Sequence, residues 1–139
     1  MQRIPHKLMI TVGLAAILAQ SALAQTPADT LKQLEQSAKQ TDPNFKGVSA
    51  QRGESLFKTT HGAEWSCASC HTENPAAPGK HAKTGKVIAP LAPAANTERF
   101  TRQDKVEKWF RRNCNDVLNR ACTASEQGDV LAYLMTIKN

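Results

Sequence analysis

The spacing of apolar residues predicts a short helix early in the chain. Within residues 26–43, Leu31, Leu34 and Ala38 recur at intervals of three and four, so they share one face of a helix. Asp29 is placed to cap the first turn, and the proline at position 43 stops the helix. Ser49 is placed to cap a second helix, whose apolar residues lie near its end, at positions 56 and 57.

Two further helices are predicted in the last third of the chain. Thr101 and Asp104 have the spacing of a capping box, with Asp in place of Glu or Gln, and Thr123 and Glu126 repeat it. Apolar residues at helical spacing follow the first pair: Val106, Trp109 and Phe110. They also follow the second pair, as a core-facing stripe: Val130, Leu131, Leu134 and Met135. The pattern predicts an all-α fold of about four or five short helices and no convincing strand.

Residues 72–100 break this periodicity. The segment is rich in alanine and contains Pro75, Pro78, Gly79, Gly85, Pro90 and Pro93. This composition predicts a long irregular loop. Such loops are uncommon in small domains unless they surround something, and a bound group is a plausible occupant.

The first 24 residues have the pattern of a secretory signal peptide. Arg3 and Lys7 precede an apolar run over residues 8–18, and Ala22 to Ala24 supplies small residues at the expected cleavage positions. An uncleaved membrane anchor is the alternative, but the apolar run is short for a span. We therefore predict a cleaved segment 1–24 and a single exported domain 25–139.

Charge and size narrow the function classes. The domain 25–139 keeps 16 of the 18 basic residues and all 12 acidic ones, a net charge of about +4. No dense basic block argues for nucleic acid, and no later apolar stretch argues for stable membrane insertion. A mildly basic surface suits an acidic protein partner or an anionic surface. A domain this small usually needs a disulfide, metal or cofactor, and all four cysteines lie in it.

Residues 67–71 read Cys-Ala-Ser-Cys-His, the attachment motif of c-type haem. On one helical turn, the thiols of Cys67 and Cys70 can both reach vinyl groups on one side of the porphyrin, and His71 can bind the iron. A redox dithiol and half of a zinc site are the alternatives. No βαβ pattern supports the first, and no second C-x-x-C supports the other. Haem c with its iron is the predicted cofactor.

The residue on the other face of the iron is less clear from spacing. Met135 is the only methionine left after cleavage, and its place on an apolar stripe favours a core role. His61 and His81 are expected to face solvent. From the sequence alone, Asn113 is expected to be the C-cap of the helix that contains Trp109. Because the compartment is oxidising, Cys114 and the cysteine at position 122 are expected to form a disulfide.

Several stretches resemble the sphaeroides haem protein (SHP) family of monohaem c-type cytochromes, which is related to cytochrome c''. They are residues 84–93, 99–100, 106–109, 112–115, 122–123 and the final helix. The resemblance covers the chain from about Arg52 onward and implies a class I-like cytochrome c fold around one covalent haem. In that family, the Asn before the first cysteine of a disulfide binds the ferric iron. That position is Asn113, before Cys114 of the Cys114–Cys122 pair. Cytochrome c'' has His there instead.

The same resemblance implies a function. A neutral amide oxygen suits ferric iron better than softer ferrous iron, so reduction should release Asn113 and allow a diatomic gas such as O₂, NO or CO to bind. It also implies a periplasmic location, with a dihaem cytochrome c as electron donor and a membrane cytochrome b upstream. A carbonyl near Ala89 or Pro90 is expected to support His71.

Two other functions stay open at this point. The first is a plain electron carrier, in which His81 or Asn113 stays bound in both redox states. The second is an oxidoreductase acting on NO, peroxide or hydroxylamine, although no distal His–acid pair for acid–base chemistry is evident. The sequence thus favours an electron-transfer and ligand-binding haem protein over a dedicated enzyme.

Overall fold

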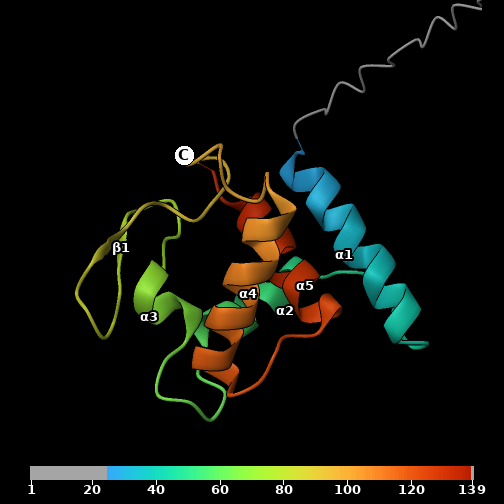
Figure 1. Ribbon diagram of the computed structural model, residues 1–139, viewed down its shortest axis with the longest axis horizontal. Helices are drawn as coiled ribbons and strands as arrows, with labels where there is room; N and C mark the ends of the chain where they lie inside the picture. The colour runs from blue at the N-terminus through green and yellow to red at the C-terminus, as the bar shows by residue number, and fades with distance from the viewer. Residues whose placement is uncertain (1–24, 139) are drawn as a thin grey trace, which may run out of the picture.

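The computed structural model describes residues 25–138, so the predicted signal peptide lies outside the described residues. This part of the chain forms five helices and one hairpin (Figure 1). They are α1 (Pro27–Thr41), α2 (Ala50–Lys58), α3 (Cys67–His71), β1 (Gly79–Lys80), β2 (Val87–Ile88), α4 (Gln103–Leu118) and α5 (Ala124–Thr136). The all-α prediction is confirmed. Within residues 25–138, no helix has the length and apolar character needed to cross a membrane.

The expectation of no strand was wrong for residues 79–88. Strands β1 and β2 pair antiparallel, with Gly79 opposite Ile88 and Lys80 opposite Val87. Each strand has two residues, which is too short for the alternation of polar and apolar residues that identifies a strand in sequence.

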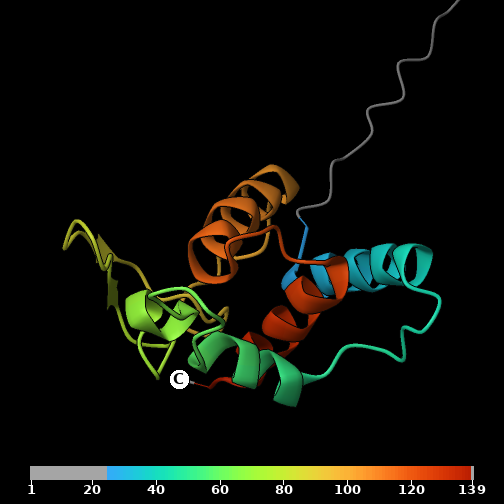
Figure 2. The ribbon, with the colours of Figure 1, turned by 90° about the horizontal axis from the view of Figure 1, so that it is seen from below.

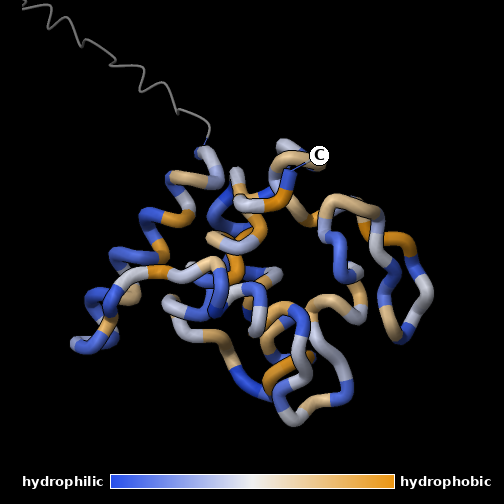
Figure 3. Tube along the Cα trace, turned by 180° about the vertical axis from the view of Figure 1, so that it is seen from behind, coloured by the Kyte–Doolittle hydropathy of each residue, from blue (hydrophilic) through white to orange (hydrophobic). Residues whose placement is uncertain are grey.

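Helix α5 packs closely against both α2 and α1, and the three helices form the core. Phe57 of α2 and Leu131 and Leu134 of α5 are fully buried there. At Gly53 a Cβ atom would overlap the backbone carbonyl oxygen of Asp129, so only glycine lets α2 and α5 approach this closely. In Figure 3, the tube of α1 alternates between hydrophilic and hydrophobic stretches, as a helix with one buried face should.

A buried carboxylate also joins α2 to α5. The side chain of Asp129 is 7% exposed and accepts hydrogen bonds from Arg52 Nε at 2.7 Å and Nη2 at 2.8 Å. The backbone N–H of Ser49, at the start of α2, donates to the same carboxylate at 2.6 Å. The paired and hydrogen-bonded charge therefore fixes the first turn of α2 against α5.

Two of the predicted helix caps are confirmed. The side chains of Ser49 and Thr123 accept hydrogen bonds from the N–H groups of Arg52 and Glu126. In α1 the N-cap is Thr26, and the predicted Asp29 lies three residues later, inside the helix. The Asp29 carboxylate accepts a hydrogen bond from the Thr26 N–H and so completes the capping box.

The capping box predicted for α4 was wrong. The N-cap is Arg102, which makes no side-chain cap hydrogen bond. The Thr101 hydroxyl donates to Glu98 O at 2.8 Å, and Asp104 instead pairs with the Arg102 guanidinium at 2.7 Å. The N-cap lies one residue after the predicted Thr101, and the side chains of Thr101 and Asp104 have other partners.

Helix α4 packs only sparsely against the other helices and strands of the described chain. In Figure 1 α4 lies in front of α2, and Figure 2, turned by 90°, shows α4 on one side of the molecule, apart from α2 and α3 on the other. Its buried residues are Val106, Cys114 and Val117. Two residues predicted for the core are exposed: Trp109 at 47% and Met135 at 41%. An exposed tryptophan on a sparsely packed helix indicates a surface that suits another apolar group.

Candidate haem site

Helix α3 presents the attachment motif on a single turn. Ser66 caps it by accepting from the N–H of Ser69, and the Ser69 hydroxyl accepts from the N–H of Ser66. This reciprocal cap starts the helix at Cys67, so Cys67, Cys70 and His71 lie within one turn and a half. Both thiols are free and half-buried.

The thiol chemistry argues against a redox dithiol. Burial raises the pKa of Cys67 to about 11, so the thiol is protonated at neutral pH. A thioredoxin-type cysteine instead needs a lowered pKa to act as a nucleophile. The zinc alternative also lacks donors, because residues 25–138 contain no cluster of three or more His, Cys, Asp or Glu side chains able to hold a metal ion.

His71 is held as a neutral imidazole. Burial, and secondarily the charge of Arg99, lowers its pKa to about 4. The centroid of its ring lies 6.4 Å from the ring centroid of Phe57. The Phe57 ring centroid in turn lies 5.5 Å from that of Tyr133. The core of α2 and α5 therefore supports the His71 side of the site, and a neutral ring nitrogen is the form that binds iron.

The predicted support for His71 stays a prediction. Arg99 donates from Nη2 to Ala89 O at 2.8 Å and from Nε to Pro90 O at 2.9 Å. Within residues 25–138, the structure shows no hydrogen bond from the His71 ring. Arg99 is a residue that sequence reasoning missed, and its half-buried guanidinium fixes the proline loop beside α3.

The loop of residues 72–100 packs against α3. Pro75 is fully buried, and its carbonyl accepts from the N–H groups of Leu91 and Ala92 at 2.9 and 3.0 Å. Gly79 approaches Cys70 O so closely that a Cβ atom there would overlap it. The loop is therefore built against the attachment turn.

Asn113 lies inside α4, so the C-cap interpretation was wrong. The helix continues to Leu118 and ends at Asn119, whose left-handed backbone (φ 56°) makes it the C-cap. At 3.6 residues per turn, Asn113 shares a face with Trp109 and Asp116, beside the buried stripe. Asn113 is exposed and thus available to a ligand on this face.

A cleft of about 520 Å³ separates the C-terminal half of α4 from the segment that leads into α3. It is lined by Gly62, Ala63, Glu64, Trp65 and Lys83 on one side and by Asn115, Asp116 and Asn119 on the other. The segment just before the attachment motif and the C-terminal half of α4 therefore line the same cleft, which neither the motif nor Asn113 itself lines.

Cys114 and Cys122 lie at disulfide distance, with Cα atoms 5.5 Å apart. Cys114 is buried within α4, and Cys122 precedes α5. The pair therefore ties the turn that carries Asn113 to the start of α5.

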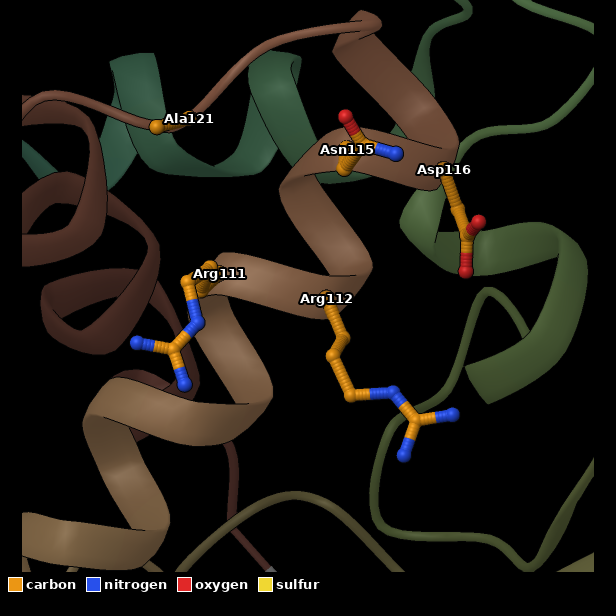
Figure 4. A pocket seen from close by; sticks show the side chains of 5 residues that line it. All are labelled: Arg111, Arg112, Asn115, Asp116 and Ala121. Carbon is orange, nitrogen blue, oxygen red and sulfur yellow. The ribbon is translucent and has the colours of Figure 1, made fainter.

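A second hollow, of about 450 Å³, lies on the outer side of α4 near Ala121 (Figure 4). Figure 4 shows Arg111 and Arg112 extending to opposite sides of the helix, so their guanidinium groups do not converge. Arg112 lies over the Trp109 ring at 5.3 Å. We assign no binding role to this hollow.

The other axial candidates are placed less favourably. His61 is exposed, as predicted, and its Nε2 lies 3.2 Å from Leu56 O. His81 is half-buried, and its Nδ1 accepts from two loop N–H groups at 3.3 and 3.4 Å. Met135 is on α5, the helix whose Tyr133 contacts the Phe57 beside His71. A ligand across from His71 is better placed on α4.

The residues fit a covalent haem. Two free thiols and a neutral imidazole lie on one turn, a loop packs around them, and the facing helix is sparsely packed with an exposed tryptophan. An apolar group between α3 and α4 would give α4 the packing partner that α5 provides for α1 and α2.

The chain has clear relatives of known type. A family model described as a domain of unknown function (DUF1924) matches residues 43–134. Cytochrome c'' of Methylophilus methylotrophus is 48% identical over 103 residues, which cover 71% of this chain and 72% of that protein. The cytochrome c-type protein SHP of Cereibacter sphaeroides is 41% identical over 127 residues, which cover 87% of this chain and 93% of SHP.

Solved structures agree with these sequence relatives. Oxidised SHP, described as an oxygen-binding cytochrome c, superposes with a TM-score of 0.71 at 38% identity, covering 81% of this chain and 98% of SHP. Oxidised cytochrome c'' of Methylophilus methylotrophus gives a TM-score of 0.73 at 40% identity, covering 81% and 95%. A solution structure of the same cytochrome c'', presented as insight into haem-ligand detachment, matches similarly, with a TM-score of 0.71.

Proposed function

Because this chain belongs to the DUF1924 family and, with SHP and cytochrome c'', to one group of c-type cytochromes, we propose that it accepts electrons and binds a diatomic gas. Its cofactor is one covalent haem c with iron. We propose that Cys67 and Cys70 form the thioethers and that His71 is the proximal iron ligand.

The bound haem supplies a redox-active iron with two axial positions. His71 is suited to the permanent position, because burial keeps its imidazole neutral and the core residue Phe57 lies beside its ring. The two thiols are suited to attachment, because the capped turn of α3 holds them at fixed spacing.

We propose that Asn113 binds the ferric iron and leaves on reduction. Its position carries the proposal: it is exposed, shares a face of α4 with Trp109, and precedes Cys114 of the pair with Cys122. An amide oxygen is a hard, neutral donor that suits ferric iron and holds the softer ferrous iron poorly. Asn113 therefore vacates one axial position when an electron arrives.

A gas ligand could then bind where Asn113 was. One relative, SHP, is described as oxygen-binding, and work on the other, cytochrome c'', concerns haem-ligand detachment, so O₂, NO and CO are the ligands to test. Export to the periplasm through the segment 1–24 belongs to this proposal. So does a redox partner of the dihaem cytochrome c type, supplied by a membrane cytochrome b.

A CO titration of the dithionite-reduced protein tests this function. We expect a saturable Soret shift at stoichiometric or micromolar CO, without the slow step that displacement of a tightly bound ligand would impose. A reduced protein that binds no CO would identify a plain electron carrier.

A further inference from the structure

The hairpin, defined here as residues 79–88, is strongly and uniformly basic. It carries Lys80, Lys83 and Lys86, and the sequence contains no acidic residue between Glu73 and Glu98. All three lysines are exposed, and none of them forms an ion pair within residues 25–138. The hairpin therefore presents unneutralised positive charge.

The hairpin is also internally fixed. His81 N–H donates to Lys86 O and Gly85 N–H donates to His81 O, each at 2.8 Å. The His81 ring accepts from the N–H groups of Lys83 and Thr84. Gly85 supplies the positive φ of 69° that this tight turn needs. The charges thus sit on a defined surface that need not be ordered when a partner binds.

The hairpin contacts the attachment turn directly. The backbone N–H of Ala82 donates to Cys70 Sγ at 3.4 Å, and Gly79 packs against Cys70 O. Lys83 Nζ lies 4.7 Å from the ring centroid of Trp65, two residues before Cys67. Figures 1 and 2 both show the hairpin projecting from the body of the molecule beside α3. It is therefore the protruding element in contact with the proposed thioether sulfur.

One apolar side chain lies among these cations. Val87 is 72% exposed, the highest exposure among the large apolar residues of the described chain. A small apolar centre surrounded by charges is the composition of a transient protein interface, where charge governs encounter and a little apolar contact holds it.

We propose that the hairpin is the docking surface for the electron donor, a one-electron carrier protein with an acidic patch. This inference rests on the electron-accepting function proposed above. The donor loses one electron and the ferric iron gains it, with no bond formed or broken in the donor. Contact at the hairpin brings the donor against Cys70, so the electron enters near the covalent link.

A protein partner fits better than an anionic lipid surface. The hairpin has one large exposed aliphatic side chain, Val87, and no Phe, Trp or Tyr, so it has little to insert into a bilayer interface. Contact with the attachment sulfur matters for electron entry and would be irrelevant to membrane attachment.

Charge reversal with a matched control tests the proposal on the haem-loaded protein. One variant is K80E/K83E/K86E, and the control is K32E/K39E/K46E, which makes the same change in net charge at exposed lysines of α1 and the following linker. The probe is the hydroquinone of an acidic flavodoxin, mixed with the ferric protein by stopped flow at low and high salt.

We expect the hairpin variant to react about tenfold or more slowly at low salt and the control variant to change by less than about threefold. The difference should vanish at high salt. The triple Lys→Gln variant of the hairpin should show a smaller loss of the reduction rate. This variant removes charge without reversing it, so it tests the proposal even if charge reversal disturbs folding. Equal losses in the hairpin and control variants would overturn the proposal.

Two further measurements separate this proposal from other outcomes. Dithionite reduction and the midpoint potential of each variant show whether the iron still accepts an electron. A variant that dithionite reduces normally but flavodoxin reduces slowly has lost docking, whereas a variant that dithionite cannot reduce has lost the proposed function. Loss of binding to phosphatidylglycerol vesicles with an unchanged flavodoxin rate would make the hairpin a membrane contact and reject the protein partner.

Discussion

Helices α1, α2 and α5 are held together by their own side chains, whereas α3, the hairpin and α4 are arranged around a site. In the first region, Phe57, Leu131 and Leu134 are fully buried, and Asp129 is paired with Arg52. In the second, α4 has few packing partners and Trp109 is 47% exposed. Ala68 of α3 and Phe110 of α4 reach this core, but we expect the rest of the second region to depend more on the haem than the first.

This difference places the two proposed axial ligands, His71 and Asn113, in unlike surroundings. His71 lies against the core and has little freedom to move. Asn113 lies on a helix that few neighbours restrain, apart from the Cys114–Cys122 pair. A permanent ligand and a releasable one are what these surroundings favour.

The largest effect is expected from removing the attachment thiols. The Cys67→Ser, Cys70→Ser double variant should lose all covalent haem, measured as haem retained on a denaturing gel. Hydrogen exchange should then show α4 amides losing protection by about 100-fold or more, while α2 and α5 keep most of theirs. Equal loss of protection in α2, α4 and α5 would contradict the division into two regions.

Within the first region, Gly53→Ala should be the most damaging single change. The new Cβ overlaps the Asp129 carbonyl oxygen, which belongs to the backbone of α5 and cannot rotate away. We expect a loss of about 3 kcal/mol in the free energy of unfolding, measured by denaturant titration. Gln51→Ala, on the exposed side of the same helix, should change it by less than about 0.5 kcal/mol. Comparable values for the two variants would show that α2 and α5 are not in contact at this point.

Removing the cysteine pair should loosen only the second region. The Cys114→Ser, Cys122→Ser variant is expected to lose about 2–3 kcal/mol of stability, because the pair closes a short loop in the unfolded chain. If the pair also governs the movement of Asn113, the spin change on reduction and the CO affinity will change as well. A stability loss with an unchanged spin change and CO affinity would leave the pair as a structural link alone.

The smallest effect is expected from pH at the start of α5. The Arg120 guanidinium, followed by the hydrogen bonds from Thr123, lowers the pKa of Glu126 below its usual 4.5. A lowered pKa in the folded state stabilises the protein above pH 4.5, and this contribution is lost as pH falls through the folded value. Because these groups are partly exposed, it should stay below about 1 kcal/mol. Glu126→Gln should flatten the acid limb of the stability curve, and an unchanged limb would contradict this assignment.

The sequence was sufficient where the signal was local. The Ser49 and Thr123 caps and the buried stripe at Val130, Leu131 and Leu134 were predicted at the right residues. In each case the relevant partners lie within a few positions along the chain, so spacing alone specifies them.

The sequence was misleading where the partner is distant or is not a protein side chain. Trp109 has the spacing of a core residue, because apolar periodicity is the same whether the neighbour is another helix or a cofactor. Asn113 and Asn119 are both plausible C-caps, and only the tertiary structure shows that α4 continues to the second. Arg99 contacts carbonyls nine and ten residues away, which no local pattern indicates.

We propose above all that Asn113 binds ferric iron and leaves on reduction. The most direct test of this proposal is absorption and EPR spectroscopy of the oxidised protein and of the protein reduced with dithionite under argon, in wild type, Asn113→Ala and Asn115→Ala. We predict low-spin ferric and high-spin ferrous iron in the wild type and Asn115→Ala, and high-spin iron in both states of Asn113→Ala. A wild-type spectrum that stays low-spin after reduction would contradict the account and return attention to His81.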